Sequence, residues 1–247
     1  MLTFWAKTSG TWINILLVIL GTLSGLLLRH RLSANMQTII TQAVGLTTIF
    51  IGISMAQALS KASFAGIEGV ILGLIALVLG GLLGEWWQIE FRLISFGDWI
   101  KARVQGGHRF TEGFVAASLL FCIGPMAILG SLNNGLLGDD TILVVKSTMD
   151  GLVSVALTGT YGIGVGFSIL PIFLYQGGLS LLSGSLSQIV SSPESDPNIL
   201  LITGIGGIMI LGLGFNLLDA SKIRIASFIP ALAIGPIFAG LATFILR

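Results

Sequence analysis

Charged residues are scarce in this chain of 247 residues. They make up 9% of it, whereas soluble domains carry roughly 25%. Hydrophobic residues make up 54%, and the mean hydropathy is +0.98. The net charge is only +1 and no run of like charges occurs, so neither a nucleic-acid-binding surface nor an acidic tail is indicated. The composition excludes an ordinary soluble domain and predicts an integral membrane protein.

Cysteine and histidine are almost absent. The single cysteine, Cys122, cannot form an internal disulfide, and its setting "LLFCIG" is typical of a small buried hydrophobe. The two histidines, His30 and His108, fall in expected loops without metal-site spacing such as HExxH. Glycine patterns of the Walker or dinucleotide type are also missing, and "GLLGDD" at 135–140 has the wrong spacing for an intramembrane aspartyl protease. We therefore expect no enzyme activity, no metal and no cofactor.

Apolar runs long enough to cross a bilayer, about 20 residues each, fill most of the chain. They predict an all-α integral membrane protein with eight transmembrane helices in one polytopic domain, 1–247. The expected spans are 11–28, 36–58, 66–85, 113–132, 141–160, 162–183, 199–218 and 226–245. The stretch 161–190 contains no charge and is interrupted by Pro171, so it is either one broken span or two short pieces.

The basic residues favour one crossing for that stretch. With eight spans, three connections share one side and hold eight of the twelve basic residues, which predicts that this side is cytoplasmic. These residues are Arg29, Arg31, Arg92, Lys101, Arg103, Arg109, Lys222 and Arg224. The longest connection, 86–111, mixes tryptophan with basic residues and predicts an amphipathic segment in the membrane interface.

A weak internal similarity links two spans. "IFIGISMAQAL" at 49–59 aligns with "MILGLGFNLLD" at 209–219, which places Gly52 on Gly212. If units 11–85 and 162–245 correspond, they are five crossings apart and form an inverted repeat with broken helices, an architecture typical of secondary transporters. Chance similarity between glycine-rich helices is the alternative. A second pair, "CIGPMAILG" at 122–130 and "AIGPIFAGL" at 233–241, does not fit the same symmetry.

Both members of that second pair contain Gly-Pro inside an expected span. Gly124 with Pro125 and Gly235 with Pro236 are predicted to kink or break their helices, because proline lacks a backbone donor and clashes one turn back. Carbonyl groups freed at such breaks can line an ion or solute site, although an ordinary structural kink is the alternative.

Two opposite charges lie within one expected span. Lys146 and Asp150 are four residues apart, which places them on one helical face. A charge near the middle of the bilayer costs about 2.5 to 3.5 kcal/mol on insertion scales, so these side chains should face protein or water. We interpret them, with Ser147 beside them, as a solute or ion site; a structural tie between helices is the alternative. Further predicted ligands are Asn133, Asn134 and Asn216.

Three stretches carry a resemblance to a known family. They are "RFTEGFVAASLLFCIGPMAILGSLNNGLLGDDTILVVKSTMDG", "GIGVGFSILPIFLYQG" and "GLGFNLLDASKIRIASFIPAL". With them, nearly the whole chain resembles the prokaryotic membrane family named domain of unknown function 554. The resemblance implies a polytopic inner-membrane protein; members are often labelled as transporters, with no assigned substrate and no established residue roles.

The residues therefore predict a secondary transporter or channel-like permease for a small solute or ion, located in the inner cell membrane. Asp150 is the expected ionisable centre, and Lys146 its charge partner. The alternative is a membrane scaffold or regulator that associates through glycine-rich faces such as Gly21 and Gly25, for instance as a homodimer. The expected partners are the lipid bilayer and a small solute or ion, not nucleic acid.

Overall fold

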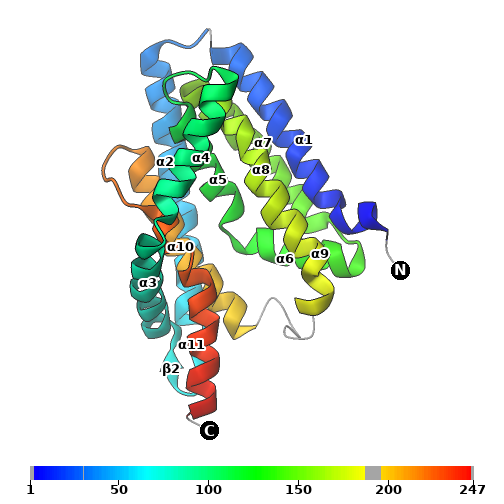
Figure 1. Ribbon diagram of the computed structural model, residues 1–247, viewed down its shortest axis with the longest axis vertical. Coiled ribbons are helices and arrows are strands. Elements are labelled where there is room, and N and C mark those ends of the chain that lie inside the picture. Colours follow the sequence, from blue (N-terminus) through cyan, green and yellow to red (C-terminus); the bar gives the residue numbers. More distant parts are fainter. Residues whose placement is uncertain (1–2, 30, 187–195, 246–247) are drawn as a thin grey trace. The chain divides into compact units, whose positions relative to one another are not determined.

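A computed structural model describes residues 3–29, 31–186 and 196–245 (Figure 1). It confirms the all-α class, since helices form nearly all of these residues. The first elements are α1 (Phe4–Arg29), α2 (Ala34–Ala56), η1 (Gln57–Ser60), β1 (Ser63–Phe64), β2 (Ile67–Glu68), α3 (Gly69–Trp86) and α4 (Ile89–Val104). Then follow α5 (Phe110–Cys122), α6 (Pro125–Leu137), α7 (Thr141–Tyr161), η2 (Gly162–Ser168), α8 (Ile169–Ile172), η3 (Phe173–Gly177), α9 (Gly178–Leu186), α10 (Pro197–Leu217), η4 (Ile225–Phe228) and α11 (Ala231–Ile245). The two strands form an antiparallel hairpin.

The chain forms two compact units, which are described separately. Unit 1 comprises 1–44 and 94–191, and unit 2 comprises 45–93 and 192–247. Each expected repeat places its first span in unit 1 and its last span in unit 2. The inverted repeat itself stays a prediction.

Unit 1 is organised around α1, which contacts both arms of a long helical hairpin. Gly10, Gly21 and Gly25 of α1 face successive residues of α7, so these two helices run parallel. The chain turns back at Gly162, where φ is +79°, a value that glycine adopts without strain. Gly166 and Gly177 then face Thr22 and Thr11, so the second arm runs antiparallel to α1. Figure 1 shows this arrangement of α1, α7, α8 and α9.

Six helical stretches of the described residues are long and apolar enough to cross a membrane. The count rises to seven if the bent pair α5 and α6 is one span. One of the six, Thr141–Ser183, has 43 residues, roughly twice the length that a crossing requires. Because this stretch reverses at Gly162, its two arms can be separate crossings. The prediction of eight spans therefore stays open, and the reversal favours it.

The predicted break at Gly124 and Pro125 is present. Helix α5 ends at Cys122, α6 begins at Pro125, and the two axes differ by 61°. Proline suits the first position of a helix, where its missing N–H would have no partner. The span expected at 113–132 is thus two short helices that meet at an angle.

Of the kink or break predicted at Gly235 and Pro236, the break does not occur, and a kink stays a prediction. Both residues lie inside α11, which continues through the proline. The proline occurs in the second turn and removes one backbone hydrogen bond, the bond to Leu232. Gly235 packs closely against Ile205 of α10.

Unit 2 also packs antiparallel helices through glycine. From Gly45 onward, α2 crosses α10, with Gly52 against Leu211 and Gly207 against Ala56. In the same way α3 packs against η4 and α11, since Gly80 faces Ala231 and Gly81 faces Phe228. The inverted repeat would relate three pairs of elements: α1 with α8–α9, α2 with α10, and α3 with α11. The two members of each pair run in opposite directions, which favours the repeat.

Helix α4 occupies most of the predicted interfacial segment. Its two buried residues are Gly97 and Ile100, and the rest is at least partly exposed. Arg103 lies over the Trp99 ring, 4.1 Å from its centroid. The exposed aromatic and basic side chains agree with a helix in the membrane interface.

The glycine contacts lead to a test of helix packing. A Cβ on Gly25 would lie 2.6 Å from the Val155 carbonyl oxygen. We expect Gly25→Ala to lower the unfolding free energy by about 1–3 kcal/mol, the range typical of overpacking. Gly240→Ala is the matched control, because nothing lies within 4 Å of a Cβ there. Thermal unfolding in detergent measures both; equal melting temperatures would contradict the packing.

Glu90 of α4 leads to a test of pH dependence. Its carboxylate accepts a hydrogen bond from the Ala226 N–H at 2.7 Å, and burial raises its pKa above 4.5. The folded protein then holds this proton more tightly than the unfolded chain, so Glu90 loses its stabilising contribution as the pH rises above 4.5. Glu90→Gln keeps a hydrogen-bond acceptor but cannot ionise. We therefore expect its stability to increase relative to the wild type as the pH rises above 4.5. Melting temperatures of the wild type and the variant at several pH values measure this difference. Glu68→Gln, at an exposed position, is the control.

Candidate functional site

An ion pair lies inside unit 1. Lys146 Nζ contacts Asp150 Oδ2 across one turn of α7, and each residue is only 7% exposed. Asp150 is nine residues from Thr141, the start of α7, or about 14 Å along the axis at 1.5 Å per residue. This depth is near the middle of a hydrocarbon layer about 30 Å thick. The sequence spacing predicted this pairing.

Two amide side chains complete the arrangement. Asn14 Nδ2 of α1 donates to Asp150 Oδ2 at 3.0 Å and to Gln176 Oε1 of η3 at 3.0 Å. Both amide residues are fully buried. Asn14, Lys146, Asp150 and Gln176 are called the polar cluster below. The cluster joins α1, α7 and η3, the helical elements that meet in unit 1.

The chemistry of these bonds fixes which way the two amides point. Asn14 contacts two oxygen atoms, so the contacting atom must be its nitrogen, which leaves Oδ1 as its acceptor. Gln176 accepts through its oxygen, which leaves its Nε2 as a donor. Among the described residues, neither Asn14 Oδ1 nor Gln176 Nε2 has a hydrogen-bond partner. The cluster therefore holds one unused acceptor and one unused donor.

More buried hydroxyl groups without a partner lie in the same unit. Within the described part of the chain they are those of Thr11, Thr22, Ser131, Ser154, Thr158, Ser168, Ser180 and Ser183. A buried polar group without a hydrogen bond costs about 1–3 kcal/mol. Such a concentration in one unit requires an explanation beyond packing.

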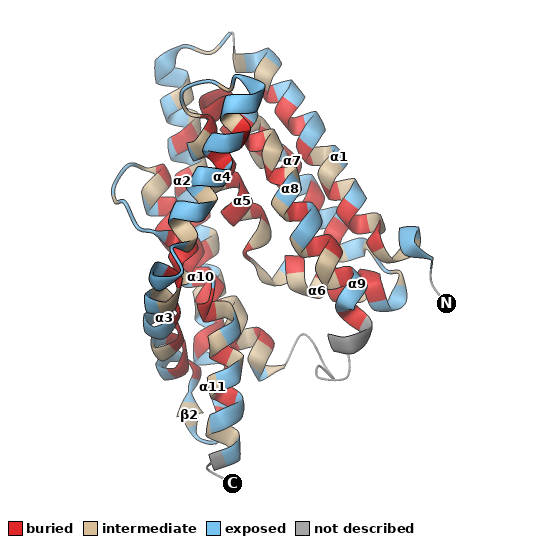
Figure 2. Cartoon of the chain, viewed as in Figure 1, coloured by how far each residue is buried: buried red, intermediate tan, exposed pale blue. Residues whose placement is uncertain are grey.

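The polarity of α7 is inverted relative to a helix of a soluble protein. Its buried face carries Lys146, Asp150 and Ser154, whereas Val145, Met149 and Leu152 are exposed. Figure 2 shows buried and exposed residues alternating along α7 and α1. An apolar exterior around a polar interior is the arrangement expected of a helix that faces lipid on one side.

Of the other predicted ligands, Ser147 and Asn134 lie near the cluster without joining it. The Ser147 hydroxyl donates to the Leu143 carbonyl at 2.5 Å. The Asn134 amide binds the start of α1: it donates to the Ala6 carbonyl at 3.0 Å and accepts from the Gly10 N–H at 3.1 Å. Asn133, its neighbour on α6, is half-buried and is not a partner of either charge.

Asn216 belongs to unit 2 and has a structural role there. Its Nδ2 donates to the Ile223 carbonyl at 2.7 Å, and its Oδ1 accepts from the Ile223 N–H at 2.8 Å. It also accepts from the Ser221 hydroxyl at 3.0 Å. These bonds hold the connection after α10, so both ends of this amide are occupied.

Neither Asn14 nor Gln176 was among the ligands predicted from the sequence. A signal was available, because Asn14 interrupts the apolar run "TWINILLVIL". A lone amide in a membrane span is costly unless it is bonded, so it marks an inward face. The sequence could not predict which charged residue Asn14 would contact.

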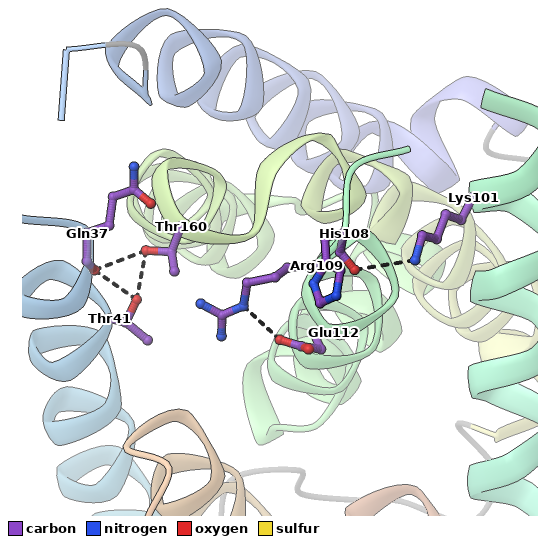
Figure 3. A network of polar contacts seen from close by, with 7 residues as sticks. All are labelled: Gln37, Thr41, Lys101, His108, Arg109, Glu112 and Thr160. Atoms are coloured by element: carbon purple, nitrogen blue, oxygen red, sulfur yellow. Dashed lines mark hydrogen bonds and ion pairs between the residues drawn. The ribbon is translucent and has the colours of Figure 1, made fainter. Parts of the chain in front are cut away.

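The end of unit 1 near the Gly162 reversal carries a second set of polar contacts (Figure 3). The Thr41 and Thr160 hydroxyls lie 2.7 Å apart, and both lie within hydrogen-bond distance of the Gln37 carbonyl oxygen. Arg109 pairs with Glu112 at 2.8 Å and stacks on the Tyr161 ring, 4.4 Å from its centroid. This end of the unit is therefore held by polar contacts.

No group of three His, Cys, Asp or Glu residues that could hold a metal ion occurs in the described residues. Cys122, at the end of α5, lies within electrostatic range of Lys146 and Asp150. The helix break between α5 and α6 is thus close to the ion pair. What the site offers chemically is a matched pair of charges and hydrogen-bonding amides.

These features define the class: an α-helical membrane protein with several membrane-spanning helices and a charged pair in its interior. Within that class, the chain belongs to the family described as "Protein of unknown function (DUF554)", which matches residues 9–240. The resemblance read from the sequence is thereby confirmed.

Two relatives match almost end to end. The chain is 31% identical over 229 residues to the "Uncharacterized membrane protein YdfK" of Bacillus subtilis (strain 168), covering 92% of this chain and 94% of that protein. It is 26% identical over 230 residues to the "Uncharacterized protein YqgA" of Escherichia coli (strain K12), covering 90% and 92%. No solved structure matches.

The ion pair leads to a test by single and double neutralisation. Removing one buried partner leaves the other charge uncompensated, which costs about 3–5 kcal/mol. We expect Lys146→Met and Asp150→Asn each to lower the melting temperature, and the double variant to be more stable than either single variant. Thermal unfolding of the four proteins measures this coupling. Additive losses would contradict a direct pairing of the two charges.

Proposed function

We propose that this protein is a secondary transporter or channel-like permease for a small solute or ion, in the cytoplasmic membrane, rather than an enzyme. The observation that carries the proposal is the polar cluster. Its four buried residues hold opposite charges together with an unused donor and an unused acceptor. If the ion pair served only to hold helices together, buried hydrogen-bonding groups without a partner would not be required.

Breaks in the regular helices support the same reading. Helix α5 ends at Cys122, within electrostatic range of the ion pair, and the α5–α6 break follows. On another side Gln176 lies in η3, a π-helical turn, and such turns occur frequently at functional sites. Discontinuous helices around a site near the bilayer midplane recur in secondary transporters, because the broken segments can move independently.

The antiparallel pairing of corresponding spans is a third support. An inverted repeat would allow the bundle to open toward either side of the membrane around a fixed site. In unit 1, α1 contacts both arms of the α7–α9 hairpin, so α1 is the element about which such a rearrangement would occur.

The glycines named for the scaffold alternative do not form an outer surface. Gly21 and Gly25 do not lie on an outer face; they pack against Gly151 and Val155 of α7 within unit 1. These glycines are therefore used inside the chain and are not available for a partner. A homodimer formed through other residues stays a prediction.

A labelling experiment tests whether the site opens to water. In a Cys122→Ala background we would introduce cysteine at Ser154, which is fully buried, and at Leu152, which is 69% exposed on the apolar face of α7. A charged thiol reagent reacts with the thiolate form in water. We expect Ser154→Cys to be labelled and Leu152→Cys to be protected by lipid, the reverse of their exposure in the structure.

The comparison has an internal control. Both variants become reactive after unfolding in detergent, which shows that each thiol is intact. Protection of both positions in native membranes would mean that the interior of unit 1 stays closed to water, and the transport proposal would fail.

A further inference from the structure

The hydrogen-bonding groups of the polar cluster restrict the kind of solute that it can bind. The inference developed from them rests on the proposed function, because it names the substrate class of that same site. It starts from three observations: the paired charges, the orientation of the two amides, and the unused atoms on those amides.

Charge balance comes first. The cluster is neutral as it stands, because Lys146 and Asp150 neutralise each other. An anion that bound Lys146 alone would leave Asp150 without its partner, and a cation at Asp150 would do the same to Lys146. Either event leaves an uncompensated charge inside the bundle, which is strongly unfavourable. A solute that carries both charges replaces one ion pair by two and keeps the sum at zero.

The amide atoms point to the same class. Asn14 Oδ1 is an acceptor without a donor, and Gln176 Nε2 is a donor without an acceptor, in the described residues. An ammonium group supplies donors only, and a carboxylate supplies acceptors only. One solute with both groups would satisfy both amides. A protonated weak acid also has a donor and an acceptor, but it carries no charges to replace those of the opened ion pair.

We propose that the polar cluster binds a small zwitterionic solute with one ammonium and one carboxylate group, of the size of an amino acid. Its ammonium group contacts Asp150 and Asn14 Oδ1. Its carboxylate contacts Lys146 and Gln176 Nε2. The internal ion pair opens to admit the solute and closes again when the solute leaves, so the cluster never carries a net charge.

The Thr11 hydroxyl is a further candidate contact. It is buried and without a partner in the described part of the chain, and it lies one turn before Asn14 on α1. Its methyl group lies 3.7 Å from the position of a Cβ on Gly177, the residue after Gln176. A solute bound to the unused atoms of the two amides would therefore have a hydroxyl group nearby.

The test uses simple probes of defined charge. Thermal unfolding of the purified protein would be followed with glycine, β-alanine or γ-aminobutyrate, and with propionate and ethylammonium as singly charged controls. A ligand that binds only the folded protein raises its melting temperature by mass action. We expect at least one zwitterion to raise it by several degrees at millimolar concentration, and neither singly charged probe to do so.

Two double variants make the result specific. Lys146→Met with Asp150→Asn removes the site's charges together and should abolish the shift. Lys61→Met with Glu68→Gln removes one exposed charge of each sign in unit 2 and should retain the full shift.

Each other outcome has a definite meaning. Stabilisation by propionate or ethylammonium alone would overturn the zwitterion assignment but leave a solute site in place. If no probe shifts the melting temperature while Ser154→Cys is labelled from water, the substrate class is wrong and the proposed function stands. If no probe acts and Ser154→Cys is protected, both proposals fall.

Discussion

The structure depends on one constraint: a lysine and an aspartate are buried together in an otherwise apolar helix. Lys146 and Asp150 neutralise each other, and Asn14 adds a hydrogen bond to the shared carboxylate oxygen. In lipid neither charge has another source of solvation, so the bundle must enclose both. This requirement determines which face of α7 turns inward and why α1 and η3 pack against that face.

Glycine makes that enclosure possible. Lipid tails are as apolar as leucine, so helices in a membrane associate through close packing and hydrogen bonds instead of the hydrophobic effect. Glycines at helix contacts let backbones approach, as at Gly25 against Val155 and Gly52 against Leu211. Close packing of α1 and α7 brings Asn14 within 3.0 Å of Asp150. The small residues and the polar cluster are thus two parts of one arrangement.

Much of this could be predicted from sequence because it depends on local spacing. Apolar length gave the helical class, four-residue spacing gave the ion pair, and Gly-Pro gave the break before α6. The partners of the pair could not be predicted, since local pattern does not say which helix faces which. Asn216 shows the same limit: its amide bonds to the connection after α10, and a ligand role for it stays a prediction. The same Gly-Pro pattern lies inside α11 at Pro236, where the helix continues, so the local pattern alone does not decide whether a helix ends.

The central claim is that water reaches the polar cluster in the folded protein. Hydroxyl-radical footprinting of the wild-type chain in lipid nanodiscs tests it without any substitution, because radicals oxidise sulfur side chains next to water. Cys122 lies within electrostatic range of the ion pair, and Met209 is buried in α10 of unit 2. The account predicts rapid oxidation of Cys122 and protection of Met209. Equal protection of both sulfur atoms would contradict it and indicate a closed bundle held by a structural ion pair.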